Sequence, residues 1–460
     1  MSDASPHPAP ATAPADVSPT AWALLPLLVF LGLFFGSGLY HLWAGTERAF
    51  YQLRAPIAIL PAIGLALWMG RGPLTERIQA FLQGIGDLTI MTMCIVFLLA
   101  GAFSSVMDAI GAVDATVSAG IALIPGWMLL PGLFLISALI STAMGTSNGT
   151  VAAIVPVAVG LGEATGLNLP LAVGTVIGGA MFGDNLSIIS DTTIAATRTQ
   201  ECSMRDKFFA NVWIAVPAAG ATVAVLLALG TNASAPEASV SSPWLVVPYL
   251  LVLGLAVAGV NVIVVLASGV LLAGLAGFVA PGGYSVAAFA GDIYRGFEGV
   301  FEIMLLAMFI GGLSVLIKRQ GGLAWLIHTI TRLSGRLKTD ARRTGEFSIA
   351  ALVSLNDVLT ANNVVSILLA GDVARDIAAE RGISRERTAS LLDIFACVTQ
   401  GSLPYGAQHL LGASLAGLSP LAIAGTVHYC WILGLVALGF IVWRPTGWLD
   451  ATSSLRPLQR

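Results

Sequence analysis

Twelve consecutive residues in the first half of the chain carry a high density of oxygen-bearing side chains. The segment 182–193, FGDNLSIISDTT, holds two carboxylates, two serines, two threonines and an amide, and it follows an apolar run from Leu169. If the segment is helical, Asp184 and Asp191 share one face. If it breaks near Gly183, freed carbonyls join the carboxylates as hard oxygen donors. Either geometry predicts a cation site, whereas a polar loop outside the membrane is the alternative.

A second polar element, GTSNGT at 145–150, follows the run Met128–Met144, which has no charged residue. Two glycines that flank hydroxyl and amide side chains allow a helix to unwind and to offer its carbonyls and amides to an ion. The alternative is close helix packing through small residues. We favour the site, with Thr146, Ser147 and Asn148 as its members.

The second half carries a matching pair of polar segments, LNDVLTANNVVS at 355–366 and DIFACVTQGSLPYGAQ at 393–408. Asn148 and Asn362, Gly166 and Gly382, and Ser187 and Ser402 are separated by 214, 216 and 215 residues. This nearly constant spacing indicates an internal repeat. Interhelical hydrogen bonds are the alternative role for these side chains. The candidate residues of the second half are Asp357, Thr360, Asn362, Asn363, Ser366, Gln400, Ser402 and Tyr405.

The elements that position these residues must lie in a membrane. Of the 460 residues 56% are apolar and only 10% are charged, and the mean hydropathy is +0.86, whereas soluble domains carry about 25% charged residues. The net charge of −3 is too small to indicate a partner, and the absence of a basic block predicts no nucleic-acid partner. The four cysteines are scattered singly, without the spacing of a metal site.

Apolar stretches long enough to cross a bilayer recur along the chain, and we count roughly eleven to thirteen of them. Gly- and Pro-interrupted segments at corresponding places in two halves indicate the central site of a transporter. The sequence therefore predicts an all-α polytopic membrane protein with two inverted repeats and broken helices. Its predicted regions are a disordered tail at 1–20, a first transmembrane repeat at 21–230, connecting spans and a basic loop at 231–345, a second-half site region at 346–443, and a C-terminal tail at 444–460.

The two first-half elements resemble those of the NhaC-type sodium/proton antiporters, which carry GTS-x-GT and FGD-x-x-S-x-x-SDTT. The resemblance implies an ion-transporter architecture of inverted repeats and a sodium site at Asp184 and Asp191, completed by Ser187, Ser190 and Thr192. The chain departs from the family at Asn148, where an aromatic residue is expected, and at Ile188-Ile189, where a Pro-Leu pair is usual. Where the family often shows a TSDQ-like element, residues 360–363 read TANN and lack the carboxylate.

We therefore predict a secondary transporter of the bacterial cytoplasmic (inner) membrane that exchanges sodium ions for protons, which compete for one carboxylate while the repeats give alternating access. It is not expected to be an enzyme or to hold a cofactor. Its expected partners are sodium, protons and lipid, and a homodimer is possible. One alternative is a sodium- or proton-coupled carrier of a small organic acid or amino acid, with Asn362, Asn363 and Gln400 as hydrogen-bonding groups. A minor alternative, an intramembrane aspartyl protease, expects a Tyr-Asp pair that the sequence lacks.

Overall fold

The computed structural model describes residues 18–46, 52–123, 125–187, 190–229, 243–258, 260–280, 283–336 and 341–443. All regular elements in these ranges are helices, which confirms the predicted all-α fold. The predicted N-terminal tail up to residue 17 and the predicted C-terminal tail at 444–460 lie outside the described residues, as do Ile188 and Ile189.

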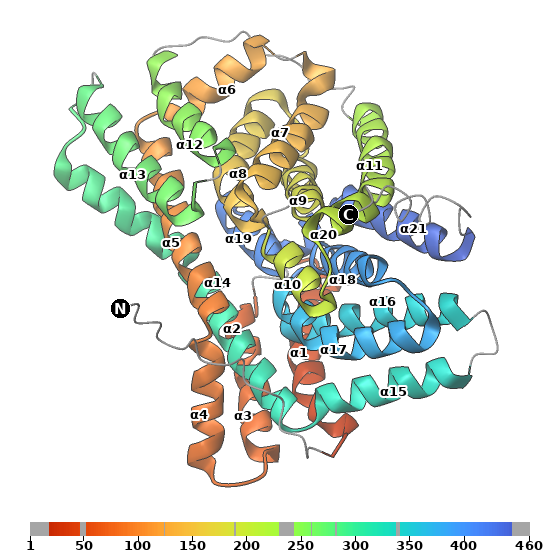
Figure 1. Ribbon diagram of the computed structural model, residues 1–460. Helices are drawn as coiled ribbons and strands as arrows, with labels where there is room; N and C mark the ends of the chain where they lie inside the picture. The colour runs from red at the N-terminus through yellow and green to blue at the C-terminus, as the bar shows by residue number, and fades with distance from the viewer. Residues whose placement is uncertain are drawn as a thin grey trace, which may run out of the picture.

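The described part of the first half contains eleven α-helices (Figure 1), which are α1 (Leu25–Trp43), α2 (Ala55–Ala58), α3 (Leu60–Met69), α4 (Leu74–Ile85), α5 (Leu88–Ala109), α6 (Ala112–Leu123), α7 (Leu129–Met144), α8 (Ser147–Thr165), α9 (Leu169–Leu186), α10 (Asp191–Gln200) and α11 (Met204–Leu229). The described part of the second half contains α12 (Val247–Val257), α13 (Val262–Val279), α14 (Val286–Arg319), α15 (Gly322–Arg336), α16 (Ala341–Thr360), α17 (Asn363–Arg381), α18 (Arg385–Gln400), α19 (Ala407–Ala416), α20 (Pro420–Ala424) and α21 (His428–Trp443).

Seven helical stretches among the described residues are long and apolar enough to cross a membrane, namely 21–41, 88–109, 126–144, 169–200, 204–229, 262–279 and 286–319. Shorter apolar helices cover 55–69, 244–255 and 428–443. The stretches 346–370 and 388–416, which the sequence presents as spans, are interrupted at 361–362 and 401–406. Hydropathy counts such half-helices as whole spans because it does not register where a helix ends.

A repeat is visible in the order of the helices. The succession α7, break, α8, α9, break, α10 recurs as α16, break, α17, α18, break, α19, and the starts of α9 and α18, of α10 and α19, and of α11 and α20 are each 216 residues apart. Left-handed residues show the same offset of 216 positions. Gly145, Gly166 and Glu201 in the first repeat correspond to Ala361, Gly382 and Gly417 in the second. The structural register therefore pairs Asn362 with Thr146, not with Asn148. The sequence comparison was wrong here because it matched identical letters, whereas the fold repeats its backbone geometry.

The two repeats are packed into each other. Helix α10 lies against α17 and α18, and α19 lies against α8 and α9, so that the short helix after each second break contacts the helices of the other repeat. In Figure 1 α10 lies between α9 and α17. The structure supports one shared centre in this way, while the predicted pseudo-two-fold axis in the membrane plane stays a prediction.

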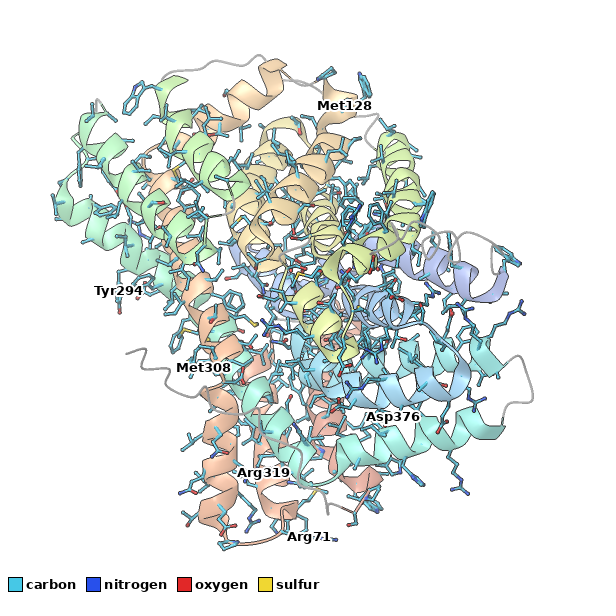
Figure 2. All side chains as sticks on the ribbon, in the orientation of Figure 1. Arg71, Met128, Tyr294, Met308, Arg319 and Asp376 are labelled. Atoms are coloured by element: carbon cyan, nitrogen blue, oxygen red, sulfur yellow. The ribbon has the colours of Figure 1, made fainter. Side chains whose placement is uncertain are left out.

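The long helix α14 runs beside α4 and α5. Its close approach to α5 depends on glycine, because a Cβ added to Gly101 would meet the backbone carbonyl of Gly296. Small residues at helix contacts are typical of membrane proteins. Figure 2 shows Arg71 and Arg319 together at one end of the molecule and Met128 at the opposite end. Large apolar side chains such as Trp68, and many others on the outer helices, are exposed, which suits contact with lipid.

Candidate ion-binding site

The helix breaks arise from residues that leave helical geometry. Helix α7 stops at Gly145, which has φ of 70°, and Thr146 is extended before α8 begins. In the second repeat Ala361 takes the corresponding left-handed conformation with φ of 48°. The next residue, Asn362, caps α17 by accepting a hydrogen bond from the backbone N–H of Val365 at 3.0 Å. The polar segments 145–150 and 355–366, where the sequence predicts broken helices, therefore contain the observed breaks, although Asn148 itself lies in the first turn of α8.

The predicted break near Gly183 is wrong in position, because α9 continues through Gly183 to Leu186. A Cβ at Gly183 would meet the side chain of Ser141, so this glycine lets α7 and α9 pack closely instead of ending the helix. The observed break lies between Leu186 and Asp191. Ser190 caps the new helix by accepting from the N–H of Thr193 at 3.2 Å, and its own hydroxyl donates to the carbonyl of Asp184 at 3.0 Å.

A cavity of about 540 Å³ lies where the breaks of the two repeats meet. Residues on both sides of three breaks contribute to its wall, and the break at 361–362 contributes its own two residues and the start of α17. Nine of the predicted site residues line it: Thr146, Ser147, Asn148, Asp184, Asp191, Thr192, Asn362, Asn363 and Gln400. The structure thus brings together residues that are more than two hundred positions apart in the sequence.

Asp184 is the buried carboxylate of this cavity, with 4% of its surface exposed. Within the described residues its Oδ1 atom has no hydrogen-bond partner, and the hydroxyl of Ser147 is the polar side chain that interacts with the carboxylate. Ser147 Oγ in turn accepts from Gln408 Nε2 at 2.9 Å, and Gln400 Nε2 donates to Gln408 Oε1 at 2.9 Å. This chain of contacts connects Asp184 with Gln400, its counterpart in the second repeat 216 residues later. Asp191 lies in the first turn of α10 and is exposed in the same cavity.

The other predicted site residues do not line the cavity, namely Ser187, Ser190, Asp357, Thr360, Ser366, Ser402 and Tyr405. Several of them bond to backbone near the breaks. Thr360 donates to the carbonyl of Asn356, Ser366 to that of Asn363, and Tyr405 to that of Val358. Their hydroxyls therefore support the helix ends that shape the cavity. A direct role in binding stays a prediction for these residues.

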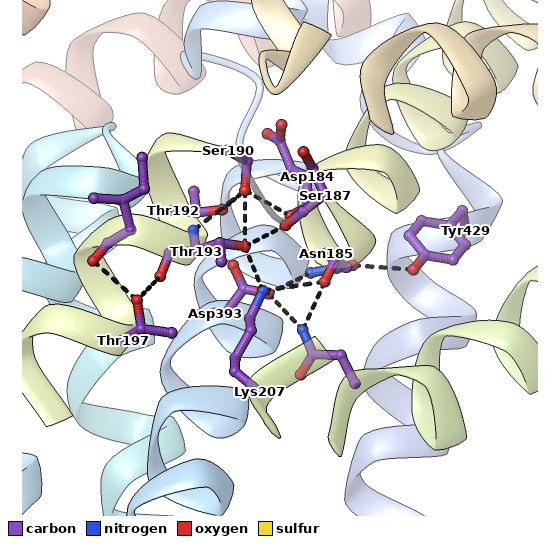
Figure 3. A network of polar contacts seen from close by, with 12 residues as sticks. Asp184, Asn185, Ser187, Ser190, Thr192, Thr193, Thr197, Lys207, Asp393 and Tyr429 are labelled. Atoms are coloured by element: carbon purple, nitrogen blue, oxygen red, sulfur yellow. Dashed lines mark hydrogen bonds and ion pairs between the residues drawn. The ribbon is translucent and has the colours of Figure 1, made fainter. Parts of the chain in front are cut away.

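A buried ion pair behind the cavity is the main feature that the sequence did not predict (Figure 3). Lys207 of α11 and Asp393 of α18 are fully buried, and Lys207 Nζ lies 2.8 Å from Asp393 Oδ2. The same ammonium donates to the carbonyl of Asn185 at 3.1 Å and to Thr193 Oγ1 at 2.7 Å. Oxygens from α9, α10 and α18 therefore surround the buried ammonium group of Lys207. In Figure 3 the side chain of Asp184 points away from this group.

Amide and phenol groups complete this network. Asn211 Nδ2 donates to Asp393 Oδ2 at 2.7 Å and to the carbonyl of Asn185 at 2.8 Å, and Tyr429 donates to Asn185 Oδ1 at 3.0 Å. The carbonyl of Asn185 is one of those that the end of α9 leaves free, so Lys207 and Asn211 hold this break in place. Lys207 follows Arg205 and Asp206 at the start of the apolar span Met204–Leu229. A basic residue in such a cluster near the end of a span is typical of a loop, so the sequence did not indicate its burial.

Arg198 is another polar residue of the cavity wall that the sequence analysis left out of the site. It lies in the last turn of α10, where its exposed guanidinium extends the wall formed by Asp191 and Thr192. The cavity therefore contains a fixed positive charge beside its carboxylates.

Comparison with known proteins places this architecture in a family. Residues 57–231 and 230–443 match the model of the Na+/H+ antiporter family in two sections that divide the chain into its halves. The chain belongs to this family. The NhaC-type resemblance of the polar elements is thereby confirmed.

Relatives of the family differ in what their names say they carry. The chain is 26% identical over 418 residues to the Na(+)/H(+) antiporter NhaC of Bacillus subtilis, which covers 84% of this chain and 91% of that protein. It is 22% identical over 455 residues to the malate-2H(+)/Na(+)-lactate antiporter of the same organism, with 91% and 93% covered. It is 24% identical over 407 residues to the arginine/ornithine antiporter ArcD of Halobacterium salinarum, with 80% and 81% covered.

The solved structure of the Alcanivorax borkumensis YdaH transporter covers 93% of this chain and 99% of its own, with 15% identity and a TM-score of 0.42. The relatives named above are all antiporters and not enzymes.

Proposed function

We propose that this protein exchanges sodium ions for protons across the cytoplasmic membrane of a bacterium. The observation that carries the proposal is the position of Asp184. Its buried carboxylate lies on the wall of a cavity formed by the breaks of both repeats, with one oxygen that no described residue satisfies. An intramembrane carboxylate of this kind is costly unless it binds a cation or a proton.

The exchange requires only that the two ions compete for the same group. Sodium takes hard oxygen ligands, and the cavity offers the carboxylate of Asp184, the hydroxyl of Ser147 and the carboxylate of Asp191. A proton needs a single carboxylate oxygen, so protonation of Asp184 removes the strongest sodium ligand. The motion of one repeat against the other would expose the loaded site to each side in turn.

Everted membrane vesicles that contain a pH-sensitive dye test the proposal. Added sodium should dequench the dye in vesicles with the wild-type protein, and the apparent KM for sodium should increase as the pH falls, since the proton competes for Asp184. Asp184→Asn or Asp191→Asn should abolish the sodium response at normal expression. Asp372→Asn is the matched control, because Asp372 is 84% exposed in an ion pair with Arg375 on the surface of α17. A full response from both cavity variants contradicts the proposal.

A second candidate, the exchange of an organic anion, is favoured by a different observation. Helices α8 and α19 both begin at the cavity, and neither N-terminus has a side-chain cap. Free N–H groups at a helix N-terminus attract a carboxylate. Arg198 and the amides of Asn362 and Asn363 add hydrogen-bond donors, and a cavity of about 540 Å³ is larger than a single ion requires.

Proteoliposomes prepared without any organic solute distinguish the two candidates. Sodium-driven proton movement in these vesicles supports the sodium/proton exchanger. If movement occurs only after malate, lactate or an amino acid is added, the organic carrier is correct, because a site built to bond a cargo leaves its polar groups unpaired without it.

A further inference from the structure

A second buried carboxylate lies at the other repeat's first break, outside the cavity. Asp357 belongs to the last turn of α16 and is completely buried. Within the described residues neither of its carboxylate oxygens has a hydrogen-bond partner, and it takes part in no ion pair there. The cavity wall does not include it.

Few polar groups act on the carboxyl group of Asp357. The hydroxyl of Ser366 and the backbone of Asn362 lie near its carboxyl group without meeting hydrogen-bond geometry, and the Ser366 hydroxyl donates to the carbonyl of Asn363. Tyr405, whose hydroxyl donates to the carbonyl of Val358, is the titratable side chain close enough to be affected by it. Among the described residues of α14, α15, α17, α18 and α21, which pack against α16, no charged side chain is paired with Asp357.

Asp357 differs from the other two buried carboxylates of the site in what compensates its charge. Asp393 is compensated by Lys207 and accepts hydrogen bonds from Asn185 and Asn211. Asp184 reaches the cavity, where an ion can enter. Asp357 has neither a charged partner among the described residues nor access to the cavity, so an ionised Asp357 would be an unpaired charge in the interior, which is strongly unfavourable. A proton removes that charge and needs no coordination shell, whereas sodium needs several oxygens around it.

We propose that Asp357 is a second proton-binding residue of the exchange cycle, which carries a proton in the conformation shown and releases it when the break between α16 and α17 rearranges. The inference rests on the proposed sodium/proton exchange and deepens it. Asn362, which interacts with Asp357 through its backbone, also caps α17 and lines the cavity. When the proton leaves, the carboxylate lies near the start of α17, where a negative charge is favoured, and can accept from backbone N–H groups there once the Asn362 cap rearranges.

A proton on Asp357 changes the number of protons that are exchanged for each sodium ion. One proton on Asp184 exchanges with one sodium ion, and a further proton on Asp357 travels in the same direction as the first. The cycle then moves one net positive charge and responds to the membrane potential. With Asp357 replaced by a neutral side chain, the remaining exchange of one proton for one sodium is electroneutral.

Proteoliposomes clamped at zero potential test this through the gradient at which flux reverses. Against a tenfold proton gradient, the wild-type protein should reverse at a sodium gradient of about 100-fold, and Asp357→Asn at about tenfold, since each coupled proton contributes one factor of ten. Asp292→Asn is the matched control and should reverse as the wild type does. Asp292 is also buried, but it accepts a hydrogen bond from Tyr284 at 2.7 Å and is paired with Arg295. Equal reversal points for Asp357→Asn and the wild type overturn the inference.

Infrared spectroscopy of the purified protein decides the matter if Asp357→Asn does not transport. The wild type should show a carbonyl band of a protonated carboxylic acid that is absent from Asp357→Asn and is lost when sodium or a higher pH is applied. A band that is absent from the wild type, or that persists under every condition, shows that Asp357 carries no exchanging proton. The two proposals fail separately, because a wild type without sodium-driven flux refutes the exchanger, whereas the infrared result concerns Asp357 alone.

Discussion

The two repeats use the same backbone but distribute charge differently. Asp184 at the end of α9 corresponds to Gln400 at the end of α18, and Lys207 corresponds to Ile423. Conversely, Asp357 of the second repeat, whose carboxylate oxygens have no hydrogen-bond partner among the described residues, corresponds to Ser141 of the first repeat. Ser141 donates to the carbonyl of Ala180 at 2.6 Å. One repeat therefore supplies the carboxylates of the cavity and the buried cation Lys207 behind it, and the other supplies amides and a separate buried acid.

This difference shows how a repeat can keep a geometry while its chemistry diverges. Broken helices require only left-handed and extended residues at fixed places, which Gly145 and Thr146 provide in one repeat and Ala361 and Asn362 in the other. The charged residues can differ between the repeats because they bind ions or pair with each other and are not needed to form the helix break. Four predictions test the comparison, in order of decreasing effect.

The largest effect is expected when the two helix ends are compared directly. Asp184→Asn removes the anionic ligand and should abolish sodium-driven proton flux in vesicles. Gln400→Asn, at the corresponding position, shortens a neutral side chain that bonds Gln408, so it should leave flux measurable with a weaker apparent sodium affinity. Equal losses in both variants would show that the repeats contribute equally and that the charge asymmetry has no role.

The second-largest effect is expected from changes to the buried ion pair of Lys207 and Asp393. Lys207→Met leaves Asp393 as an uncompensated buried charge, and we expect a loss of about 3–5 kcal/mol of stability, measured by denaturation in detergent. Lys207→Met combined with Asp393→Asn removes both charges and should restore most of that loss. Ile423→Met at the corresponding position of the second repeat should have little effect. A double variant as unstable as Lys207→Met alone would contradict the assignment.

A smaller effect is expected at the helix caps. Asn362→Ala removes the side-chain hydrogen bond to Val365 and should cost about 1 kcal/mol, together with some apparent sodium affinity because Asn362 lines the cavity. Thr146→Ala, the corresponding change, removes no cap hydrogen bond and should leave stability nearly unchanged. Thermal unfolding of the two variants measures the difference, and the reverse order would refute this account of the caps.

The smallest effects concern the left-handed residues. Ala361 has φ of 48°, so Ala361→Gly should stabilise the protein by up to about 1 kcal/mol, reduced by the greater freedom of glycine in the unfolded chain. Gly145→Ala introduces the same strain in the first repeat and should destabilise by about 1–2 kcal/mol. Opposite signs in unfolding measurements are the required result, whereas equal signs contradict the backbone correspondence.

The site was only partly visible in the sequence. Asp184, Ser147 and Asn362 stood out because polar side chains interrupt apolar runs, and unpaired backbone groups in hydrocarbon require a reason. Ser402 and Tyr405 were grouped with them for the same reason, yet they do not line the cavity. Hydropathy records that a polar residue lies in a span, but not the direction in which its side chain points.

Composition and patterning alone determined that this chain is an all-helical membrane protein with two related halves. Apolar segments indicate contact with lipid, and the polar interruptions of these segments recur at a nearly constant spacing along the sequence. Tertiary structure alone decided the register of 216 residues, the continuation of α9 past Gly183 and the pairing of Lys207 with Asp393. These depend on which helix faces meet. Lys207 and Asp393 lie 186 positions apart, and only the packing of α11 and α18 around the end of α9 gives these two charges a reason to be buried together.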